Sequence, residues 1–333
     1  MTNNLHIAVG LTGAGWHPAA WREPGARPRE LLAASWWLEQ VREAQAGLLD
    51  LVTLDDALAL QSSDPDGPDD RVDAVRGRLD AMLLAAFLAP LTAGIGIAPV
   101  VTTTHTEPFH VSTQLATLDF VSRGRAGWLA TVSPGRWEAL HAGRRDLPSG
   151  EALLAKGAEH VEVVRRLWDS WEDGAEIRDA ERHRFVDRSK LHHIHFEGER
   201  FRVRGPSITP RPPQGQPLIL ASQEGLGADV VIQDLVVFVN GSGTEAAERR
   251  ARLDDVHPFE APVFTGTPAA LADVVAELGT VRLLPAAIPH DLRAITRDLV
   301  PELQRRGLFR RAYEPGTLRE RFGLDRPANR YAA

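Results

Sequence analysis

The chain has 333 residues, 43% of them hydrophobic and 25% charged, a composition typical of a globular protein with a sizeable core. Its formal net charge is −7 and no basic block occurs, which excludes the electrostatic surface that nucleic-acid binding needs. It has no cysteine, which excludes disulfides, thiolate catalysis and cysteine-bound metals.

The N-terminal sequence has no basic stretch ahead of a long apolar run, so we expect no secretory signal. No run of about eighteen apolar residues occurs either, so we expect no helix that spans a membrane. We therefore predict a cytoplasmic protein.

Short apolar runs alternate with longer amphipathic runs from one end of the chain to the other. The apolar runs predict strands over residues 5–11, 48–54, 95–101, 127–132, 217–221, 235–239, 261–264 and 281–284. The clearest amphipathic runs predict helices over residues 35–46, 79–91, 109–121 and 151–171. One stripe of the last helix carries Val161, Val164, Leu167, Trp168 and Trp171.

Strands that are apolar throughout, and that alternate with helices, indicate a parallel sheet covered by helices. Eight such strands favour a closed (β/α)₈ TIM barrel over an open, doubly wound sheet. We predict an α/β protein with a single barrel domain over residues 1–333. One segment, about residues 174–217, interrupts the alternation with Pro, Gly and short alternating runs. It predicts a β-hairpin and an extended stretch inserted between the fourth helix and the fifth strand.

Three motifs suggest binding sites but lack the spacing that those sites need. Residues 10–15 (GLTGAG) follow a strand, as a dinucleotide-binding turn does, but residues 16–18 (WHP) stand where a helix would have to begin. The aspartates of residues 64–70 (DPDGPDD) lack the closing Glu of a calcium loop. The histidines of residues 192–195 (HHIH) have no carboxylate at metal-ligand spacing. Loops that face solvent or the barrel mouth are the favoured interpretation, and we expect no metal.

Polar residues that follow a predicted barrel strand are candidates for an active site, because catalytic groups of such barrels lie at the carboxyl ends of the strands. His17 follows the first strand and His105 follows the third. Either could be catalytic, as a hydrogen-bond donor or a proton carrier, or could only hydrogen-bond within its loop. His105 is the better candidate because it follows its strand directly.

Two adjacent carboxylates, Asp55 and Asp56, follow the second strand, and both cannot point inward from a strand end. We predict that Asp56 lies at the carboxyl rim of the strand and faces the site. The alternative is that it caps a helix or a loop. Trp16 and Trp128 would form an aromatic wall, which suits a hydrophobic substrate.

Five segments carry a resemblance to a known family: residues 48–56 (LLDLVTLDD), 116–125 (ATLDFVSRGR), 159–171 (EHVEVVRRLWDSW), 205–217 (GPSITPRPPQGQP) and 264–270 (FTGTPAA). They resemble the nitrilotriacetate and dibenzothiophene-sulfone monooxygenase branch of the luciferase-like flavin monooxygenases, over nearly the whole chain. The resemblance implies a TIM-barrel oxidoreductase that oxygenates a hydrophobic small molecule with reduced FMN and O₂. It also implies a separate flavin reductase. We expect a homodimer, and a deazaflavin in place of FMN stays open.

The resemblance also assigns residues to the cofactor. Those that it implies are Asp56, Thr102, Thr103, Ser222, Gly225 and Gly227. The backbone amides of the two glycines could bind the FMN phosphate.

Other positions depart from the family pattern. Leu129, Gly150 and Leu154 stand where the family has Asn, His and Tyr, and Glu224 stands where it has a phosphate-binding Ser. A buried carboxylate at that position would weaken FMN binding, so Glu224→Ser is expected to strengthen it. Two functions therefore stay open: a working monooxygenase with an altered FMN site, and a catalytically degenerate barrel that acts as a binding or partner subunit.

Overall fold

The computed structural model of the protein describes residues 5–62, 64, 67–143 and 148–332. The chain divides into two compact units. Unit 1 comprises Met1–Pro99 and Ile232–Pro315, and unit 2 comprises Val100–Val231 and Gly316–Ala333. Strand β3 (Gly96–Thr102) crosses the boundary, so its first four residues belong to unit 1 and its last three to unit 2.

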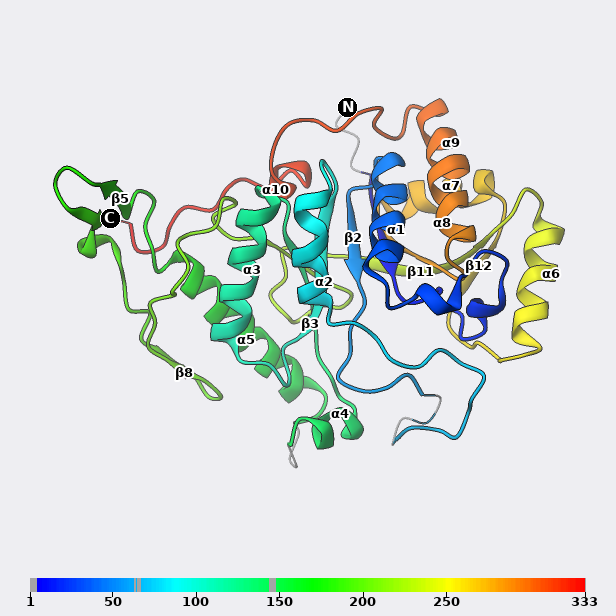
Figure 1. Cartoon of the computed structure of the whole chain (residues 1–333), viewed down its shortest axis with the longest axis horizontal. Coiled ribbons are helices and arrows are strands. Elements are labelled where there is room, and N and C mark those ends of the chain that lie inside the picture. Colours follow the sequence, from blue (N-terminus) through cyan, green and yellow to red (C-terminus); the bar gives the residue numbers. More distant parts are fainter. Residues whose placement is uncertain (1–4, 63, 65–66, 144–147, 333) are drawn as a thin grey trace. The chain divides into compact units, whose positions relative to one another are not determined.

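Unit 1 contains a parallel sheet whose strands are mostly buried. Besides the start of β3, its strands are β1 (His6–Leu11), β2 (Leu51–Leu54), β11 (Gln233–Val239), β12 (Val263–Gly266) and β13 (Thr280–Pro285). They are hydrogen-bonded in the order β12-β11-β13-β1-β2-β3. The α-helices of the unit are α1 (Ala34–Ala46), α2 (Ala81–Leu88), α6 (Gly243–Asp254), α7 (Pro268–Leu278), α8 (His290–Ala294) and α9 (Val300–Arg305) (Figure 1). Shorter turns are η1 (Ala20–Arg22), η2 (Pro28–Glu30), η3 (Ala89–Leu91) and the π-helical η5 (Ile295–Leu299).

The strand order of unit 1 differs from that of a barrel whose strands follow one another in chain order. Such a barrel would place β12 between β11 and β13, whereas β11 pairs with β13 directly and β12 lies outside it. The burial of the two strands gives the reason. The last four residues of β11 are buried, while β12 has only Gly266 buried and therefore suits an edge.

Unit 2 contains further parallel strands and two long helices. Besides the end of β3, its strands are β4 (Gly127–Thr131), β9 (Leu218–Ala221) and β10 (Val230–Val231), paired in the order β3-β4-β9-β10. Its helices are α3 (Pro108–Ser122), α4 (Arg136–His141), α5 (Glu151–Asp169), η4 (Arg188–Lys190) and α10 (Leu318–Arg321). Helices α3 and α5 pack side by side (Figure 1). The predicted stripe of α5 is buried, except that Trp171 lies past the end of the helix.

The predicted interruption of the alternation is confirmed as local structure. It forms two antiparallel hairpins, β5 (Glu176–Asp179) with β6 (Arg184–Val186), and β7 (Phe196–Glu197) with β8 (Arg202–Val203). An extended stretch then leads to β9. The prediction had one hairpin where the chain has two, because the pattern does not show where a short strand ends.

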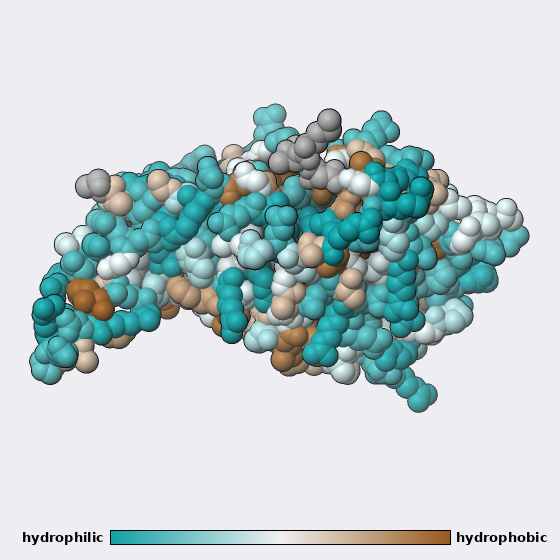
Figure 2. Space-filling view, turned by 90° about the horizontal axis from the view of Figure 1, so that it is seen from above, coloured by the Kyte–Doolittle hydropathy of each residue, from teal (hydrophilic) through white to brown (hydrophobic). Residues whose placement is uncertain are grey.

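The α/β class and the parallel strands are thus confirmed. The face seen in Figure 2 is mostly hydrophilic, with hydrophobic residues in small separate patches. In the part of the chain that the structure describes, no helix is both long and apolar enough to cross a membrane.

Candidate functional site

The carboxyl ends of β3 and β4 carry a cluster of hydroxyl groups in unit 2. The Thr103 amide and hydroxyl both donate to the carbonyl of Thr131, at 2.8 and 3.0 Å. The Thr102 hydroxyl accepts from the Thr104 amide at 3.2 Å and from the Ser133 hydroxyl at 2.9 Å. All three threonines and Ser133 are buried, so their mutual bonds order the strand ends. The structure therefore brings two predicted cofactor residues, Thr102 and Thr103, into one cluster.

The β9–β10 loop contains the other predicted cofactor residues of unit 2. Gly225 and Gly227 have φ of +91° and +69°, a left-handed conformation that favours glycine. Ser222 and Gly225 are exposed, whereas Leu226 is buried. Within residues 5–62, 64, 67–143 and 148–332, neither glycine amide donates to a protein acceptor. The loop thus offers exposed backbone donors, as an anion site requires.

Helix α5 approaches this loop closely because of one small residue. A Cβ at Gly157 would lie 2.5 Å from Leu226 Cδ2 and 2.9 Å from Thr103 Oγ1. Any larger side chain would require Leu226 and Thr103 to shift or the helix to move away from them. Gly157 therefore keeps the hydroxyl cluster and the glycine loop together within unit 2.

Asp229 anchors the far end of the loop through two arginines. Its carboxylate accepts from Arg165 of α5 and from Arg319 of α10, both at 2.9 Å. It also accepts from the amide of Ile219 at 2.9 Å. Arg165 further donates to the Gly227 carbonyl at 3.1 Å. The conformation of the loop thus depends on α5 and on the C-terminal segment, a dependence that no sequence motif indicated.

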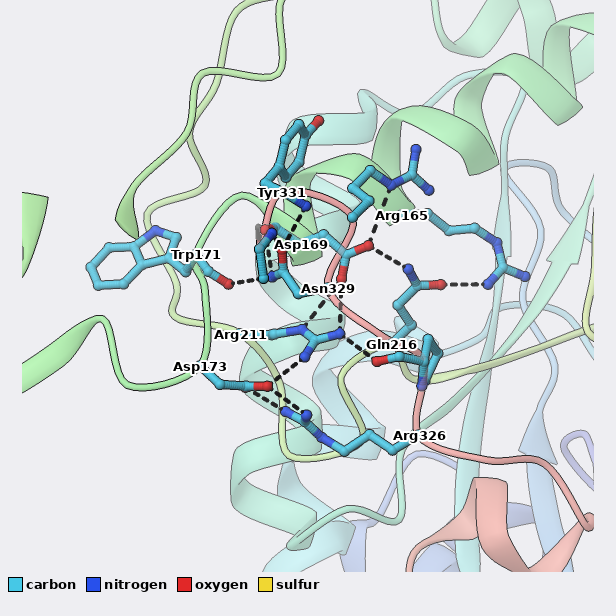
Figure 3. Close-up of polar contacts among 12 residues, drawn as sticks. Arg165, Asp169, Trp171, Asp173, Arg211, Gln216, Arg326, Asn329 and Tyr331 are labelled. Atoms are coloured by element: carbon cyan, nitrogen blue, oxygen red, sulfur yellow. Dashed lines mark hydrogen bonds and ion pairs between the residues drawn. The ribbon is translucent and has the colours of Figure 1, made fainter. Parts of the chain in front are cut away.

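A buried ionic network continues from this anchor along the C-terminal segment (Figure 3). Asp169 accepts from Arg211 at 3.1 Å and from Gln216 at 2.8 Å, and Arg211 also donates to Asp173 at 2.7 Å. The Asn329 side chain donates to the carbonyl of Asp169 at 2.8 Å. The side chains of Asp169 and Arg211 are only 1% and 3% exposed, so this pair is shielded from solvent.

Of the two adjacent aspartates in unit 1, Asp56 acts as a cap. As predicted, it follows the carboxyl end of β2, but its oxygens accept from the amides of Ala57 and Ala81, at 2.8 and 2.9 Å. Ala81 is the first residue of α2, so Asp56 has the role named as its alternative. Burial raises the pKa of its carboxyl group.

Asp55 is the aspartate that lines a cavity. Its carboxylate accepts from Arg78 at 3.2 Å and from the Thr12 hydroxyl at 3.4 Å, and burial raises its pKa. The cavity has a volume of about 290 Å³, near the lower end of the range for small-molecule pockets. Thr12 and Asp55 follow β1 and β2, so this cavity opens where those strands end. Sequence analysis missed Arg78, which lies in a polar stretch without a motif.

His17 is fully engaged in structural contacts. Its Nε2 pairs with Asp254 at 3.1 Å and its Nδ1 accepts from the Ala19 amide at 3.1 Å. Burial lowers its pKa, and its ring packs against Phe238 and Phe259. This arrangement holds the segment after β1 against β11 and α6. The loop role, rather than the catalytic one, matches its contacts.

Two of the remaining predicted residues lie near strand ends. Half-buried His105 lies between β3 and α3, as predicted. Trp16 is half-buried and donates to the Gly10 carbonyl at 3.3 Å. Trp128 differs, because it is fully buried and donates to the Val101 carbonyl at 3.0 Å. A fully buried side chain offers no surface to a substrate.

The expectation that a buried Glu224 carboxylate weakens FMN binding is wrong. The side chain is exposed, not buried beside the glycine amides. Solvent screens an exposed carboxylate, so Glu224→Ser should change FMN affinity little. The spacing of the motif could not show on which side of the loop this residue points.

The metal-like motifs form no cluster among the residues described. There, no group of three or more His, Asp or Glu side chains is arranged to hold a metal ion. His192 pairs with Glu172 at 2.6 Å, and the rings of His193 and His195 lie 5.4 Å apart. Asp66 of the aspartate-rich segment lies outside the described residues.

The chain is similar to known proteins over most of its length. A family model described as "Luciferase-like monooxygenase" matches residues 37–278. N-acetyl-S-(2-succino)cysteine monooxygenase of Bacillus subtilis (strain 168) is 28% identical, covering 98% of each chain. Nitrilotriacetate monooxygenase component A of Aminobacter aminovorans is 28% identical, covering 96% of each. One subunit of the pristinamycin IIA synthase of Streptomyces pristinaespiralis is 30% identical, covering 88% of this chain and 90% of that one.

Among solved structures, riboflavin lyase (RcaE) with modified FMN and riboflavin has a TM-score of 0.85 at 21% identity. The match covers 98% of this chain and 97% of that one, so the two share a fold. The alignments with the Bacillus and Aminobacter relatives extend over 441 and 435 positions, more than the 333 residues of this chain. Those relatives therefore contain segments that this chain lacks.

Proposed function

Because the chain belongs to the luciferase-like monooxygenase family, we propose that it is a flavin-dependent monooxygenase that uses reduced FMN and O₂ to oxygenate a hydrophobic small molecule. The observation that carries the proposal is the carboxyl edge of β3, β4 and β9, where buried hydroxyls adjoin a loop with two left-handed glycines. The closed barrel, the single domain, the homodimer and the cytoplasmic location stay predictions.

The residues of this edge fit FMN. The amides of Gly225 and Gly227 and the exposed Ser222 would hold the phosphate, and the Thr102–Thr104 segment would lie beside the ring. Bound reduced FMN would supply the electrons that activate O₂. His105, which follows β3, would steady the developing negative charge as a hydrogen-bond donor. A deazaflavin would require the same phosphate and ring contacts and stays an alternative. A separate flavin reductase would supply the reduced cofactor.

Two of the altered positions place apolar side chains at this edge. Leu129 is buried in β4, and Leu154 of α5 would be 3.7 Å from a Cβ placed on Gly225. Neither side chain can donate a hydrogen bond, and the Thr103 hydroxyl already donates to Thr131, so His105 and the hydroxyls of Thr102 and Thr104 are the candidate donors. Asp56 is a weaker cofactor candidate than its sequence position suggests, because its carboxylate already accepts from the first amide of α2.

The second function predicted from the sequence, that of a catalytically degenerate binding or partner subunit, stays a prediction. The relative from Streptomyces pristinaespiralis is named as one of the subunits of a synthase, and the chain matches it over most of both lengths. In this function the barrel would bind another chain and would not itself turn over. The experiment below separates the two functions.

The proposal predicts that Gly227→Ala weakens binding of reduced FMN by about tenfold, because alanine disfavours the left-handed backbone that presents the amide. The measurement is an anaerobic titration, followed by O₂ uptake with reduced FMN. Binding of riboflavin, which lacks the phosphate, should change much less.

Gly307→Ala is the matched control. Gly307 has φ of +74° against +69° at Gly227, and a Cβ there would meet nothing within 4 Å. It belongs to unit 1, whereas the β9–β10 loop belongs to unit 2. Equal loss of FMN affinity in both variants would refute the phosphate assignment. If the parent protein shows no oxygen-dependent turnover with reduced FMN or reduced deazaflavin, the partner-subunit function is supported instead.

A further inference from the structure

The cavity of unit 1 contains a charged group whose hydrogen bonds are incomplete. Arg78 lines the cavity and donates from Nη1 to Asp55 at 3.2 Å. Its Nε is buried and, across the described part of the chain, has no acceptor. Buried donors without an acceptor are rare in folded proteins, and each requires an explanation such as a bound ligand.

The other polar groups of the lining are already used by the protein. The amide group of Gln61 donates to the carbonyl of Gly77 and accepts from its N–H, at 3.1 and 3.0 Å. The indole N–H groups of Trp21 and Trp37 donate to backbone carbonyls, each at 2.9 Å. These two side chains therefore present apolar rings to the cavity. Arg76, the second cation of the lining, donates from Nη2 to Asp69 and to the Arg71 carbonyl. Arg78 is the cation whose buried Nε lacks an acceptor among the described residues.

Several apolar side chains also line the cavity. Leu31, Val75 and Leu84 line the cavity together with the two tryptophans. A ligand would thus meet rings and aliphatic groups on one part of its surface and the Arg78 guanidinium on another. Guanidinium groups match the planar, two-oxygen geometry of carboxylates.

We propose that this cavity binds a small molecule with an apolar body and one carboxylate, and that Arg78 is the residue that recognises the carboxylate. Asp55 neutralises Arg78 while the cavity is free, and an acid ligand would share the guanidinium with it. The inference rests on the proposed function only in that the bound acid would be the molecule to be oxygenated.

The test compares two probes of the same shape, 3-phenylpropanoate and 3-phenylpropanamide. Calorimetric titration of the full chain, without flavin, should show the acid binding at least about tenfold tighter than the amide. Arg78→Met should abolish this preference, mainly by weakening the acid. Arg311→Met is the control, because Arg311 is exposed and donates to the carbonyl of Gln304.

Two further variants keep the test decisive if Arg78→Met folds poorly. Asp55→Asn removes the competing carboxylate and should tighten acid binding several-fold. Arg78→Lys keeps the positive charge but loses the two parallel N–H donors of the guanidinium. It should therefore retain only part of the preference for the acid over the amide. Equal binding of both probes by the parent protein would overturn the proposal, as would weaker acid binding in Asp55→Asn.

A phosphate of the cofactor could supply the same negative charge, so a further titration compares FMN with riboflavin. If Arg78→Met weakens FMN but not riboflavin, Arg78 serves the cofactor and the proposal fails. The probe titrations need neither flavin nor O₂. Their outcome is therefore independent of whether the protein turns over as a monooxygenase.

Discussion

At the scale of single residues, neighbours in sequence have different roles because the chain turns between them. Asp55 and Asp56 are adjacent, yet one contacts Arg78 in a cavity and the other caps α2.

His160 is a buried histidine that sequence analysis did not single out. It is fully buried on α5, with its ring 5.9 Å from Trp128 and 5.7 Å from Phe201.

Burial, and to a lesser degree nearby Lys156, lowers the pKa of His160 to about 3. Below pH about 6.5 the unfolded chain binds a proton at this residue and the folded chain does not, so the free energy of unfolding falls as the pH is lowered. His160→Phe removes this effect. Between pH 7.5 and pH 5 we expect the variant to lose about 2 kcal/mol less stability than the parent protein.

Urea unfolding at the two pH values measures this difference. His110→Gln is a suitable control, because it removes an exposed histidine of α3 in place of a buried one. Identical pH dependence in the parent protein and His160→Phe would show that His160 takes up a proton in the folded state as readily as in the unfolded one.

At the scale of elements, the C-terminal segment acts as a brace for unit 2. Its Arg319 holds Asp229 at the end of the β9–β10 loop, and its Asn329 binds the end of α5. The capping box of Thr317 and Glu320 starts α10 and so places Arg319. Segments far apart in sequence thus jointly position the glycine loop.

Arg211→Met should destabilise the protein by about 3–5 kcal/mol, because it leaves the buried Asp169 carboxylate without its main cation. Arg326→Met is the matched control, since Arg326 also pairs with Asp173 but both of those side chains are largely exposed. We expect it to cost about 1 kcal/mol or less. Urea unfolding of both variants checks the contrast, and similar losses would mean that burial does not govern this network.

At the scale of the whole molecule, arginine carries nearly all the positive charge, since Lys156 and Lys190 are the only lysines of the chain. Arginine pairs well with carboxylates inside a protein, as Arg249 does with Asp291 and Arg211 with Asp169. Exposed pairs such as Arg200 with Glu199 contribute little.

This distribution predicts a weak response of stability to salt. Buried pairs are screened little, and salt also relieves the self-repulsion of a chain with a net charge of −7. Raising NaCl from about 0.05 to 0.5 M should change the free energy of unfolding by less than about 1 kcal/mol. Denaturation in urea, an uncharged denaturant, allows this measurement, and a loss of several kcal/mol would show that exposed ion pairs dominate.

The amino-acid sequence by itself determined the elements and the fold class. Continuous apolar runs such as residues 95–101 predicted β3 (Gly96–Thr102) closely, because strands buried on both faces need apolar side chains at every position. The long helix over 151–171 was found as α5 (Glu151–Asp169) from its single apolar stripe. The family was indicated by local motifs as well, and the match over residues 37–278 confirmed it.

The tertiary structure alone decided which strands pair and in which direction each side chain points. Strand order is one such property, because β11 and β12 have similar local patterns and only their different burial places β12 at the edge. The direction of a side chain is another. The exposure of Glu224, the burial of Trp128 and the choice between Asp55 and Asp56 depend on which neighbours the fold brings near, and the local sequence contains no record of those neighbours.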